Sequence, residues 1–194
     1  MEPTTGTDIV VGVGDCRIAS LPATSISTFA LGSCVAIIAY DWKIRIGALL
    51  HAMLPDSSID QSRATLDPFL YVDTGLKEMF RRLEERGGSS RRLKCSVAGG
   101  ASMIVDPAHF EIGKRNHLAV KKMFWKLGLF LDQEDIGGSE SRSVRLNLET
   151  GRVDMRKGAG PGKIFVPGTT SLVGSGAPER GNPGKGKSDE SIAR

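Results

Sequence analysis

Apolar residues along this chain recur with two periods, one typical of β-strands and one typical of helices. Strands are predicted where apolar and β-branched residues cluster, at residues 9–19 with a glycine interruption, 26–31, 35–40, 45–53, 93–98 and 129–131. Residues 144–148 and 152–155 predict a hairpin around Glu149-Thr150-Gly151. Almost every residue of 35–40 and 45–53 is apolar, so both faces of these two strands are expected to be covered.

Two segments have the helical period. The first is expected to begin at Asp67-Pro68, an N-cap followed by proline, and to end at Gly87-Gly88. The second is expected to open over residues 112–116 and to end at Gly128. Their apolar stripes are Val72, Leu76, Met79, Phe80 and Leu83, and Leu118, Val120, Met123, Phe124 and Leu127. The charged residues over 81–86 are expected to face solvent, and the polar segment 56–64 predicts a loop. Together the helices and covered strands predict a layered α+β fold, without selecting one order of layers.

The two most apolar strands are predicted to form a hairpin. If Trp42-Lys43 is a two-residue loop, Tyr40 faces Arg45 and Cys34 lies directly opposite His51. Cross-strand partners have Cβ atoms about 4.5–5.5 Å apart, close enough for a thiol to bond an imidazole. The turn lacks the Asn-Gly sequence that favours such loops, so this register is a hypothesis.

Size and composition predict one domain with a tail. The chain has 194 residues, of which 40% are hydrophobic and 25% charged, as in a globular protein. We expect a single domain over residues 1–157. Residues 158–194 are rich in Gly, Pro, Ser and Lys, which predicts a disordered tail. Its apolar segment Ile164-Phe165-Val166 could dock on the domain or on a partner.

The charge pattern argues against nucleic-acid binding. Three of the four net positive charges arise from residues 157–194, so the domain itself is nearly neutral. No aromatic-rich basic face or nucleic-acid motif accompanies them. No apolar run approaches the roughly 20 residues of a membrane helix, and the first residues do not form a signal peptide. We therefore expect a cytoplasmic protein without membrane insertion.

The cysteines argue against a disulfide framework and against a metal site. Cys16, Cys34 and Cys95 are odd in number and have no Cys-x-x-Cys spacing, so neither a zinc site nor any cofactor is expected. A reducing cytoplasm suits three free thiols. Cys16 and Cys95 lie in apolar alternating runs and are expected to be small buried residues.

Cys34 and His51 are the candidates for chemistry. A cysteine attacks as the thiolate, and a neighbouring imidazole can accept its proton and return it to a leaving group. Gly32 and Ser33 precede the thiol, so backbone N–H groups could hold an oxyanion there. The alternative is that Cys34 and His51 are ordinary core residues. His109, in a proline-containing loop, and His117, near a helix start, compete for the role of base.

A third group is needed to orient the imidazole. Thr28 could accept from the second ring nitrogen through its hydroxyl or through its backbone carbonyl, and both options stay open. A neutral orienter favours the imidazolium less than an aspartate would, which predicts a modestly activated thiol. The glycines of Gly99-Gly100-Ala101-Ser102 follow a strand and form either a packing corner or a wall of the substrate cleft. Gly99, Gly100 and Ser102 are therefore candidate cleft residues.

Five separated motifs, in order within residues 9–157, resemble the CheD family. They are Leu31-Gly32-Ser33-Cys34-Val35-Ala36, His51-Ala52-Met53-Leu54-Pro55, Gly99-Gly100-Ala101-Ser102, Ile112-Gly113-Lys114-Arg115-Asn116, and Gly137-Gly138 with Ser141-Arg142-Ser143-Val144. Members of this family deamidate glutamines on bacterial chemoreceptors. The resemblance implies a Cys–His–Thr triad of Cys34 as nucleophile, His51 as base and acid, and Thr28 as orienter.

The resemblance also implies a fold and partners. The expected fold is a β-sandwich flanked by helices, similar to the catalytic domain of cytotoxic necrotizing factor toxins. The expected partners are the cytoplasmic helices of methyl-accepting receptors and the CheC phosphatase. Two alternatives stay open: a docking adaptor in the signalling array with weak or dispensable catalysis, and a thiol hydrolase with another amide or ester substrate.

Overall fold

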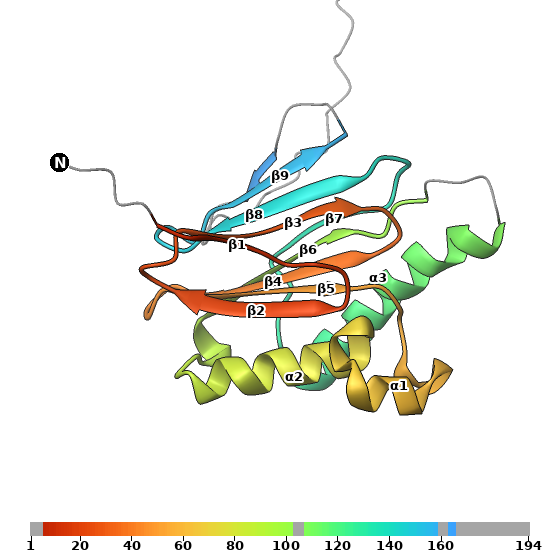
Figure 1. Cartoon of the computed structure of the whole chain (residues 1–194), viewed down its shortest axis with the longest axis horizontal. Coiled ribbons are helices and arrows are strands. Elements are labelled where there is room, and N and C mark those ends of the chain that lie inside the picture. The colour runs from red at the N-terminus through yellow and green to blue at the C-terminus, as the bar shows by residue number, and fades with distance from the viewer. Residues whose placement is uncertain (1–5, 103–106, 159–162, 166–194) are drawn as a thin grey trace, which may run out of the picture.

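Two β-sheets form the body of the protein (Figure 1). A computed structural model describes residues 6–102, 107–158 and 163–165. Within these residues each sheet has five strands. Sheet A has the order β1 (Asp8–Val10), β3 (Ser25–Leu31), β8 (Arg142–Asn147), β9 (Val153–Lys157) and β10 (Lys163–Phe165). Its strands are antiparallel neighbours except β1, which runs parallel to β3.

Sheet B contains the two most apolar strands at its centre. Its order is β2 (Asp15–Ser20), β5 (Ile46–Ala52), β4 (Val35–Asp41), β6 (Leu93–Gly99) and β7 (Gln133–Ile136). All neighbours are antiparallel except β6 and β7, which are parallel. A parallel pair needs a crossover connection, and α3 (Pro107–Leu127) supplies it.

Helices cover the face of sheet B that points away from sheet A. α2 (Val72–Glu85) and α3 pack there, with α1 (Gln61–Leu66) beside them (Figure 1). Short 3₁₀ turns occupy Ser57–Ile59, Pro68–Leu70 and Ser90–Arg92. The predicted α+β class is confirmed, because two sheets and three helices form the layers.

Alternation along β4 separates the two cores of the molecule. Ala36, Ile38 and Tyr40 pack between the sheets with residues of β3 and β8. Val35, Ile37 and Ala39 face the other way, against α2 and α3. Because apolar layers lie on both sides, every residue of β4 and β5 is buried, as their apolar runs predicted.

The register of the central hairpin differs from the prediction by two residues. Asp41 pairs with Ile46, so the loop contains the four residues 42–45 instead of two. Arg45 has φ of 52° and closes this longer turn. Ala36, not Cys34, therefore lies opposite His51. An error of two residues preserves the face on which each side chain lies, because side chains alternate along a strand.

Several element boundaries also differ from those predicted. Asp67-Pro68 opens a 3₁₀ turn, and α2 begins only at Val72, although its buried stripe is the predicted one. The predicted loop over residues 56–64 contains a 3₁₀ turn and the start of α1, where Asp60 caps the first turn. The seventh strand occupies residues 133–136, not 129–131. In α3, Leu118 and Leu127 are exposed.

The chain continues past the predicted domain boundary into one more strand. Lys163–Phe165 forms β10, which pairs antiparallel with β9 at the edge of sheet A. Backbone pairing thus places this part of the apolar segment Ile164-Phe165-Val166 on the domain. Residues 159–162 and 166–194 of the predicted tail lie outside the described residues.

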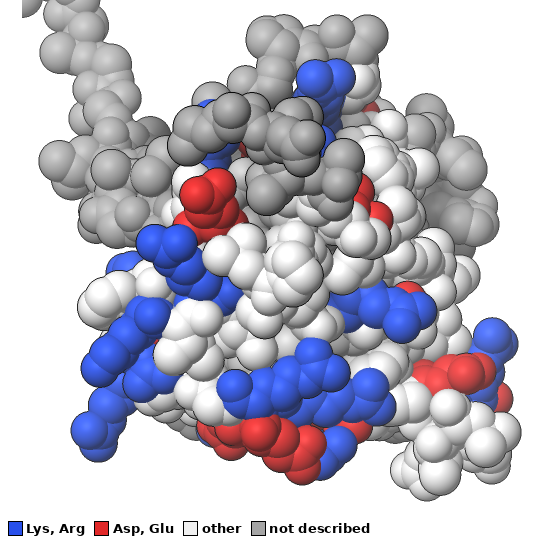
Figure 2. Space-filling view, turned by 60° about the vertical axis from the view of Figure 1, so that its left-hand side comes forward, with Lys and Arg blue, Asp and Glu red and all other residues white. Residues whose placement is uncertain are grey.

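The charged face of α2 is solvated, as the sequence predicted. Along the lower edge in Figure 2, where α2 lies in Figure 1, basic and acidic side chains are in contact. Glu78 bonds the guanidinium groups of Arg81 and Arg82 on this surface. Exposed pairs of this kind contribute little to stability.

No helix of the described residues is long and apolar enough to span a membrane.

Candidate active site

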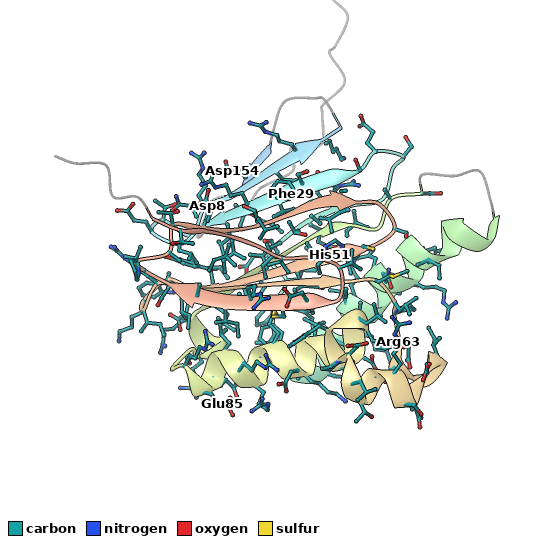
Figure 3. All side chains as sticks on the ribbon, in the orientation of Figure 1. Asp8, Phe29, His51, Arg63, Glu85 and Asp154 are labelled. Carbon is teal, nitrogen blue, oxygen red and sulfur yellow. The ribbon has the colours of Figure 1, made fainter. Side chains whose placement is uncertain are left out.

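His51 lies inside the molecule, between the two sheets (Figure 3). It is carried by β5 and is only 2% exposed. Its opposite residue, Ala36, belongs to the apolar cluster between the sheets, so the imidazole points toward sheet A. A buried imidazole needs a hydrogen-bond partner to offset its desolvation.

Thr28 on β3 supplies that partner across the gap between the sheets. Its Oγ1 lies 2.8 Å from His51 Nδ1, and both side chains are buried. The same Oγ1 donates to the backbone carbonyl of Val11 at 2.8 Å. The bond to the ring is therefore made by the Thr28 hydroxyl, which was one of two options left open by the sequence.

These two bonds determine which ring nitrogen carries the proton. A threonine hydroxyl has one hydrogen, and the Val11 carbonyl can only accept. Because the Thr28 hydrogen is used on Val11, His51 Nδ1–H must donate to Thr28 Oγ1. Nε2 is then unprotonated, which is the state a general base requires.

Cys34 lies one residue before β4 begins and on the same face as His51. It is half-buried and packs against the cluster between the sheets. Continuing the hairpin register by one residue makes Met53 its opposite position and His51 its diagonal neighbour. Diagonal side chains on one face remain within reach of each other when one of them is aromatic.

The resting site is uncharged. Burial lowers the pKa of His51. Burial also raises the pKa of the Cys34 thiol, against the opposing effect of its own backbone N–H. His51 Nε2 is buried and has no hydrogen-bond partner among the described residues, so the thiol does not bond it in this state. Catalytic hydrogen bonds are often long in substrate-free structures and tighten when substrate binds.

A β-bulge leads into the segment that carries Cys34. The pairing of β3 with β8 shifts between Thr28 and Leu31, and Ala30 has φ of 56°. Phe29 follows the inward-facing Thr28, points to the outer face of sheet A and is 56% exposed. Bulges often occur beside functional sites, where they redirect the chain.

The glycine pair packs against the backbone of Cys34. Gly100 N–H donates to the Cys34 carbonyl, and Ala101 N–H donates to the Gly32 carbonyl, both at 2.8 Å. A Cβ on Gly99 would come within 2.2 Å of the Cys34 carbonyl oxygen, and the φ of Gly99 is 115°. Of the two options for these glycines, the observed contact is a tight packing corner directly behind the thiol.

The N–H groups of the segment that leads to Cys34 are the candidate oxyanion donors. Among the described residues, none of the N–H groups of Gly32, Ser33 and Cys34 donates to a backbone carbonyl. Such groups beside a nucleophile can hold the oxyanion of an acyl-transfer reaction. The oxyanion role of Gly32, Ser33 and Cys34 stays a prediction.

The competing histidines belong to a helix and not to the central strands. Both His109 and His117 belong to α3, although the sequence predicted a loop for His109. The ring of His117 bonds Glu134 of β7. The side chain of His109 lies outside the described residues.

The candidate cleft residue Ser102 contacts the second glycine pair. Its N–H donates to the Gly138 carbonyl at 2.8 Å.

Asn116 ends the motif that begins at Ile112, but it was not among the predicted site residues. It is fully buried in α3, and its Nδ2 donates to the carbonyls of Ser33 and Met53, both at 2.9 Å. The available signal was its position, because Asn116 lies one turn before Val120 on the apolar stripe. A polar residue on a buried stripe needs a specific partner.

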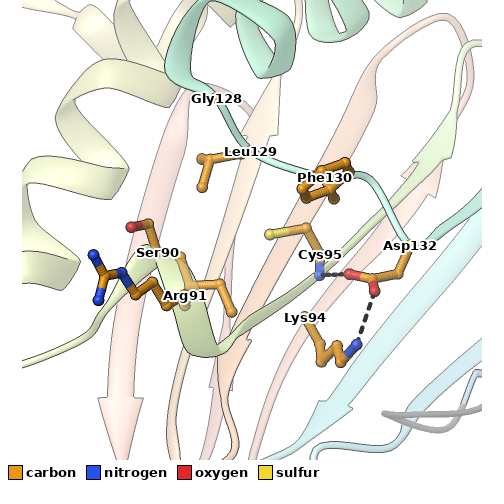
Figure 4. A pocket seen from close by; sticks show the side chains of 9 residues that line it. Ser90, Arg91, Lys94, Cys95, Gly128, Leu129, Phe130 and Asp132 are labelled. Atoms are coloured by element: carbon orange, nitrogen blue, oxygen red, sulfur yellow. Dashed lines mark hydrogen bonds and ion pairs between the residues drawn. The ribbon is translucent and has the colours of Figure 1, made fainter.

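The other two thiols are structural, as predicted. Cys95 is 2% exposed and lines a pocket of about 500 Å³ with Asp132, which accepts from the Cys95 backbone N–H (Figure 4). Burial raises the pKa of Cys95. Burial also raises the pKa of Cys16 to about 12, so neither thiol forms a thiolate at neutral pH.

Comparisons with known proteins identify relatives along most of the chain. The model of the family described as CheD chemotactic sensory transduction matches residues 53–157. A probable chemoreceptor glutamine deamidase CheD of Solibacter usitatus is 45% identical over 159 residues, which cover 82% of this chain and 94% of the relative.

Two further relatives agree with this match. The chemoreceptor glutamine deamidase CheD of Thermotoga maritima is 40% identical over 157 residues, 81% of this chain and 96% of the relative. The probable chemoreceptor glutamine deamidase CheD 1 of Syntrophus aciditrophicus is 39% identical over 154 residues, 79% of this chain and 96% of the relative. The chain belongs to the CheD family.

Proposed function

We propose that this chain is a protein-glutamine deamidase that converts specific glutamines of chemoreceptors to glutamate. The observation that carries the proposal is the Thr28–His51 bond, which leaves Nε2 unprotonated on the face that Cys34 shares. The names of the relatives in Solibacter usitatus, Thermotoga maritima and Syntrophus aciditrophicus support the same activity.

The first half of the reaction forms a thioester. His51 Nε2 takes the Cys34 proton as the sulfur attacks the side-chain amide carbon of the glutamine. The carbonyl oxygen gains negative charge, which backbone N–H groups of Ser33 and Cys34 stabilise. The tetrahedral adduct then collapses, the C–N bond breaks, and the imidazolium gives its proton to the departing ammonia.

The second half consumes one water. Nε2, again unprotonated, takes a proton from water as the water oxygen attacks the thioester carbon. The C–S bond breaks, the proton returns to the sulfur, and glutamate is released. One amide and one water thus become one carboxylate and one ammonium ion. The Thr28 hydroxyl orients the ring in both halves and stays neutral.

Each reaction adds one negative charge to a receptor helix. A new carboxylate changes the packing of a helical bundle and creates a site that can accept a methyl group. We infer that the substrate is a cytoplasmic helix of a methyl-accepting receptor, that the enzyme acts in the cytoplasm, and that the CheC phosphatase is a partner. We also infer that the layers resemble the catalytic domain of cytotoxic necrotizing factor toxins.

The test compares variants on receptor fragments. Wild-type protein and Cys34→Ala are incubated with receptor cytoplasmic fragments, and deamidation is detected by peptide mass spectrometry. We expect deamidation with wild type and none with Cys34→Ala. Cys16→Ala removes a buried thiol of the same sheet and should remain active. Binding of fragments without deamidation by wild type would instead indicate a docking adaptor.

The identity of the base is tested in the same assay. His51→Ala should abolish deamidation, whereas His109→Ala and His117→Ala should retain it. Loss of activity in either control, with activity retained in His51→Ala, would show that a different histidine is the base. A panel of glutamine peptides and methyl esters separates a deamidase from a hydrolase with another substrate.

A further inference from the structure

Asn116 connects the helical layer to the two chain segments that carry the nucleophile and the base. Its Nδ2 donates to the carbonyl of Ser33, which immediately precedes Cys34, and to the carbonyl of Met53, two residues after His51. Both partners are carbonyl oxygens, which only accept, so both amide hydrogens of Asn116 are used. The residue is 0% exposed, so water does not compete for these bonds.

These bonds lie where the β4–β5 ladder stops. Val35 and Ala52 form the last pair, and beyond it Cys34 and Met53 have no ladder partner. Asn116 bridges the two segments just past this point. A single side chain thereby continues the connection between the strands at the position where the thiol lies.

Three successive carbonyls around the thiol are anchored, and one of them depends on a side chain. Ala101 N–H holds the Gly32 carbonyl, and Gly100 N–H holds the Cys34 carbonyl. The Ser33 carbonyl between them is held by Asn116. The backbone contacts persist in any variant that folds, whereas the Ser33 contact can be removed by one substitution.

The Ser33 carbonyl and the Cys34 N–H belong to the same peptide unit. A trans peptide is planar, so its C=O and N–H point in opposite directions. Holding the carbonyl on α3 therefore directs the Cys34 N–H away from the helix. The same N–H lowers the pKa of the Cys34 thiol, against the larger effect of burial.

We propose that Asn116 is a positioning residue that aims the Cys34 backbone N–H at the sulfur and at the oxyanion of the reaction. The oxyanion part rests on the proposed deamidase function, whereas the orientation toward the sulfur does not. Asn116 touches neither the substrate nor the reacting atoms in this role. It acts through the Ser33–Cys34 peptide.

The experiment uses the full chain with Asn116→Ala and, as a variant that fills the space, Asn116→Leu. The first readout is the rate of Cys34 alkylation by iodoacetamide as a function of pH, followed by peptide mapping. We expect the midpoint to rise in both variants, because the N–H no longer stabilises the thiolate. The plateau rate at high pH should stay within about threefold, because alkylation forms no oxyanion.

The second readout is deamidation of receptor fragments. We expect kcat to fall by about 10²–10³-fold with little change in KM, as when one oxyanion donor is lost. The control Asn147→Ala removes an asparagine that accepts from Glu149 and Thr150 in the β8–β9 turn. It should change neither readout.

The possible outcomes distinguish this proposal from the proposed function. An unchanged midpoint in the folded variant overturns the positioning role. A plateau that falls together with kcat in both variants also overturns it, because the site has then collapsed as a whole. If neither variant folds, Asn116 is a folding residue and the proposal fails. A raised midpoint with no deamidation by wild type supports the orientation and refutes the deamidase.

Discussion

At the scale of single residues, one hydroxyl hydrogen sets the chemistry of the site. Thr28 gives its hydrogen to the Val11 carbonyl and receives one from His51 Nδ1. The ring is therefore held in one tautomer without a carboxylate. Burial lowers the pKa of His51 and raises the pKa of the Cys34 thiol, so the resting pair stays neutral.

Replacing Thr28 by valine tests this role with a side chain of nearly the same shape. Thr28→Val removes the acceptor for Nδ1–H, so we expect the deamidation kcat to fall by about 10- to 100-fold, as for other partners that orient a histidine. The buried Val11 carbonyl and Nδ1–H lose their partner, which should cost about 1–3 kcal/mol in unfolding free energy. Urea unfolding measures that cost. Thr28→Ser keeps the hydroxyl and should restore most of the rate; equal losses in both variants would contradict the role.

The pH dependence follows from the burial of His51. The base must be unprotonated, and burial lowers its pKa below the ordinary 6.5. We therefore expect the acid limb of kcat/KM below pH 6.5. The unfolded imidazole binds its proton first as pH falls, so stability should also decline below pH 6.5. A pH series of rates and of urea unfolding measures both; a limb above pH 6.5 would contradict the assignment.

Differences among the three thiols predict selective alkylation. Cys34 is half-buried, whereas Cys16 and Cys95 are buried and carry no N–H contact that offsets burial. Iodoacetamide should therefore label Cys34 first, as measured by peptide mapping at several times. Equal labelling of all three in the folded protein would mean that Cys34 has no special environment.

The residues of the candidate site were predicted from the sequence, and the structure corrects the predicted geometry between two of them. Cys34, His51 and Thr28 were recognised from residue chemistry and from a family resemblance. The direct pairing of Cys34 with His51 was wrong, because the loop after Asp41 has four residues and not two. Loop length depends on the conformation of Arg45, which has φ of 52° and no glycine to signal it.

At the scale of elements, two neighbouring features determine the path of the segment between β3 and β4 that carries Cys34. The bulge at Phe29–Ala30 ends regular pairing on one side, and the corner at Gly99-Gly100 supports the other. Neither feature was specified by the hydrophobic pattern, because a bulge and a corner both interrupt the period from which strands are recognised.

Two glycines with positive φ allow a matched test of the corner. Gly99→Ala would place a Cβ within 2.2 Å of the Cys34 carbonyl oxygen, whereas a Cβ on Gly128 would meet nothing within 4 Å. Gly128→Ala should therefore cost only the backbone strain, about 1–2 kcal/mol. Gly99→Ala should cost more and should also lower kcat, because the Cys34 peptide must shift. Unfolding curves and deamidation rates of the two variants measure this; equal kcat values would contradict the support role.

Helices were predicted more reliably in their buried stripe than in their ends. All five predicted apolar positions of α2 are buried, but the helix begins four residues after Pro68, because a 3₁₀ turn intervenes. In α3 the exposure of Leu118 and Leu127 and the burial of Asn116 depart from the expected stripe. The helix α3 packs against the segments after β3 and β5, and Asn116 bonds the carbonyls of Ser33 and Met53 there. This contact explains why a polar residue is buried at a position where the helical period predicted an apolar one.

At the scale of the whole molecule, a buried ion pair joins the two sheets. Arg142 of β8 in sheet A bonds Asp135 of β7 in sheet B at 2.8 Å, and both side chains are nearly inaccessible. The same guanidinium donates to the carbonyls of Gly137 and Glu140. The sheets are thus connected by charge as well as by the apolar cluster between them.

Removing the Arg142 side chain should lower the free energy of unfolding far more than removing the side chain of Arg145 in the same strand. Arg142→Ala leaves Asp135 buried with Lys157 as a remaining charged partner, so we expect a loss of about 3–5 kcal/mol. Arg145→Ala breaks an exposed pair with Asp8, and its effect should be much smaller. Chemical unfolding of both variants measures the difference, and similar losses would show that burial does not determine the strength of the pair.

The pairing of β3 with β8 has a consequence for synthesis of the protein. The ribosome releases Thr28, Cys34 and His51 before it translates β8. Val144 of β8 is the residue that pairs with Thr28 in sheet A. Sheet A cannot be completed until that strand emerges. A nascent chain therefore exposes the thiol and the imidazole before sheet A is complete, and it becomes competent only after β8 has emerged.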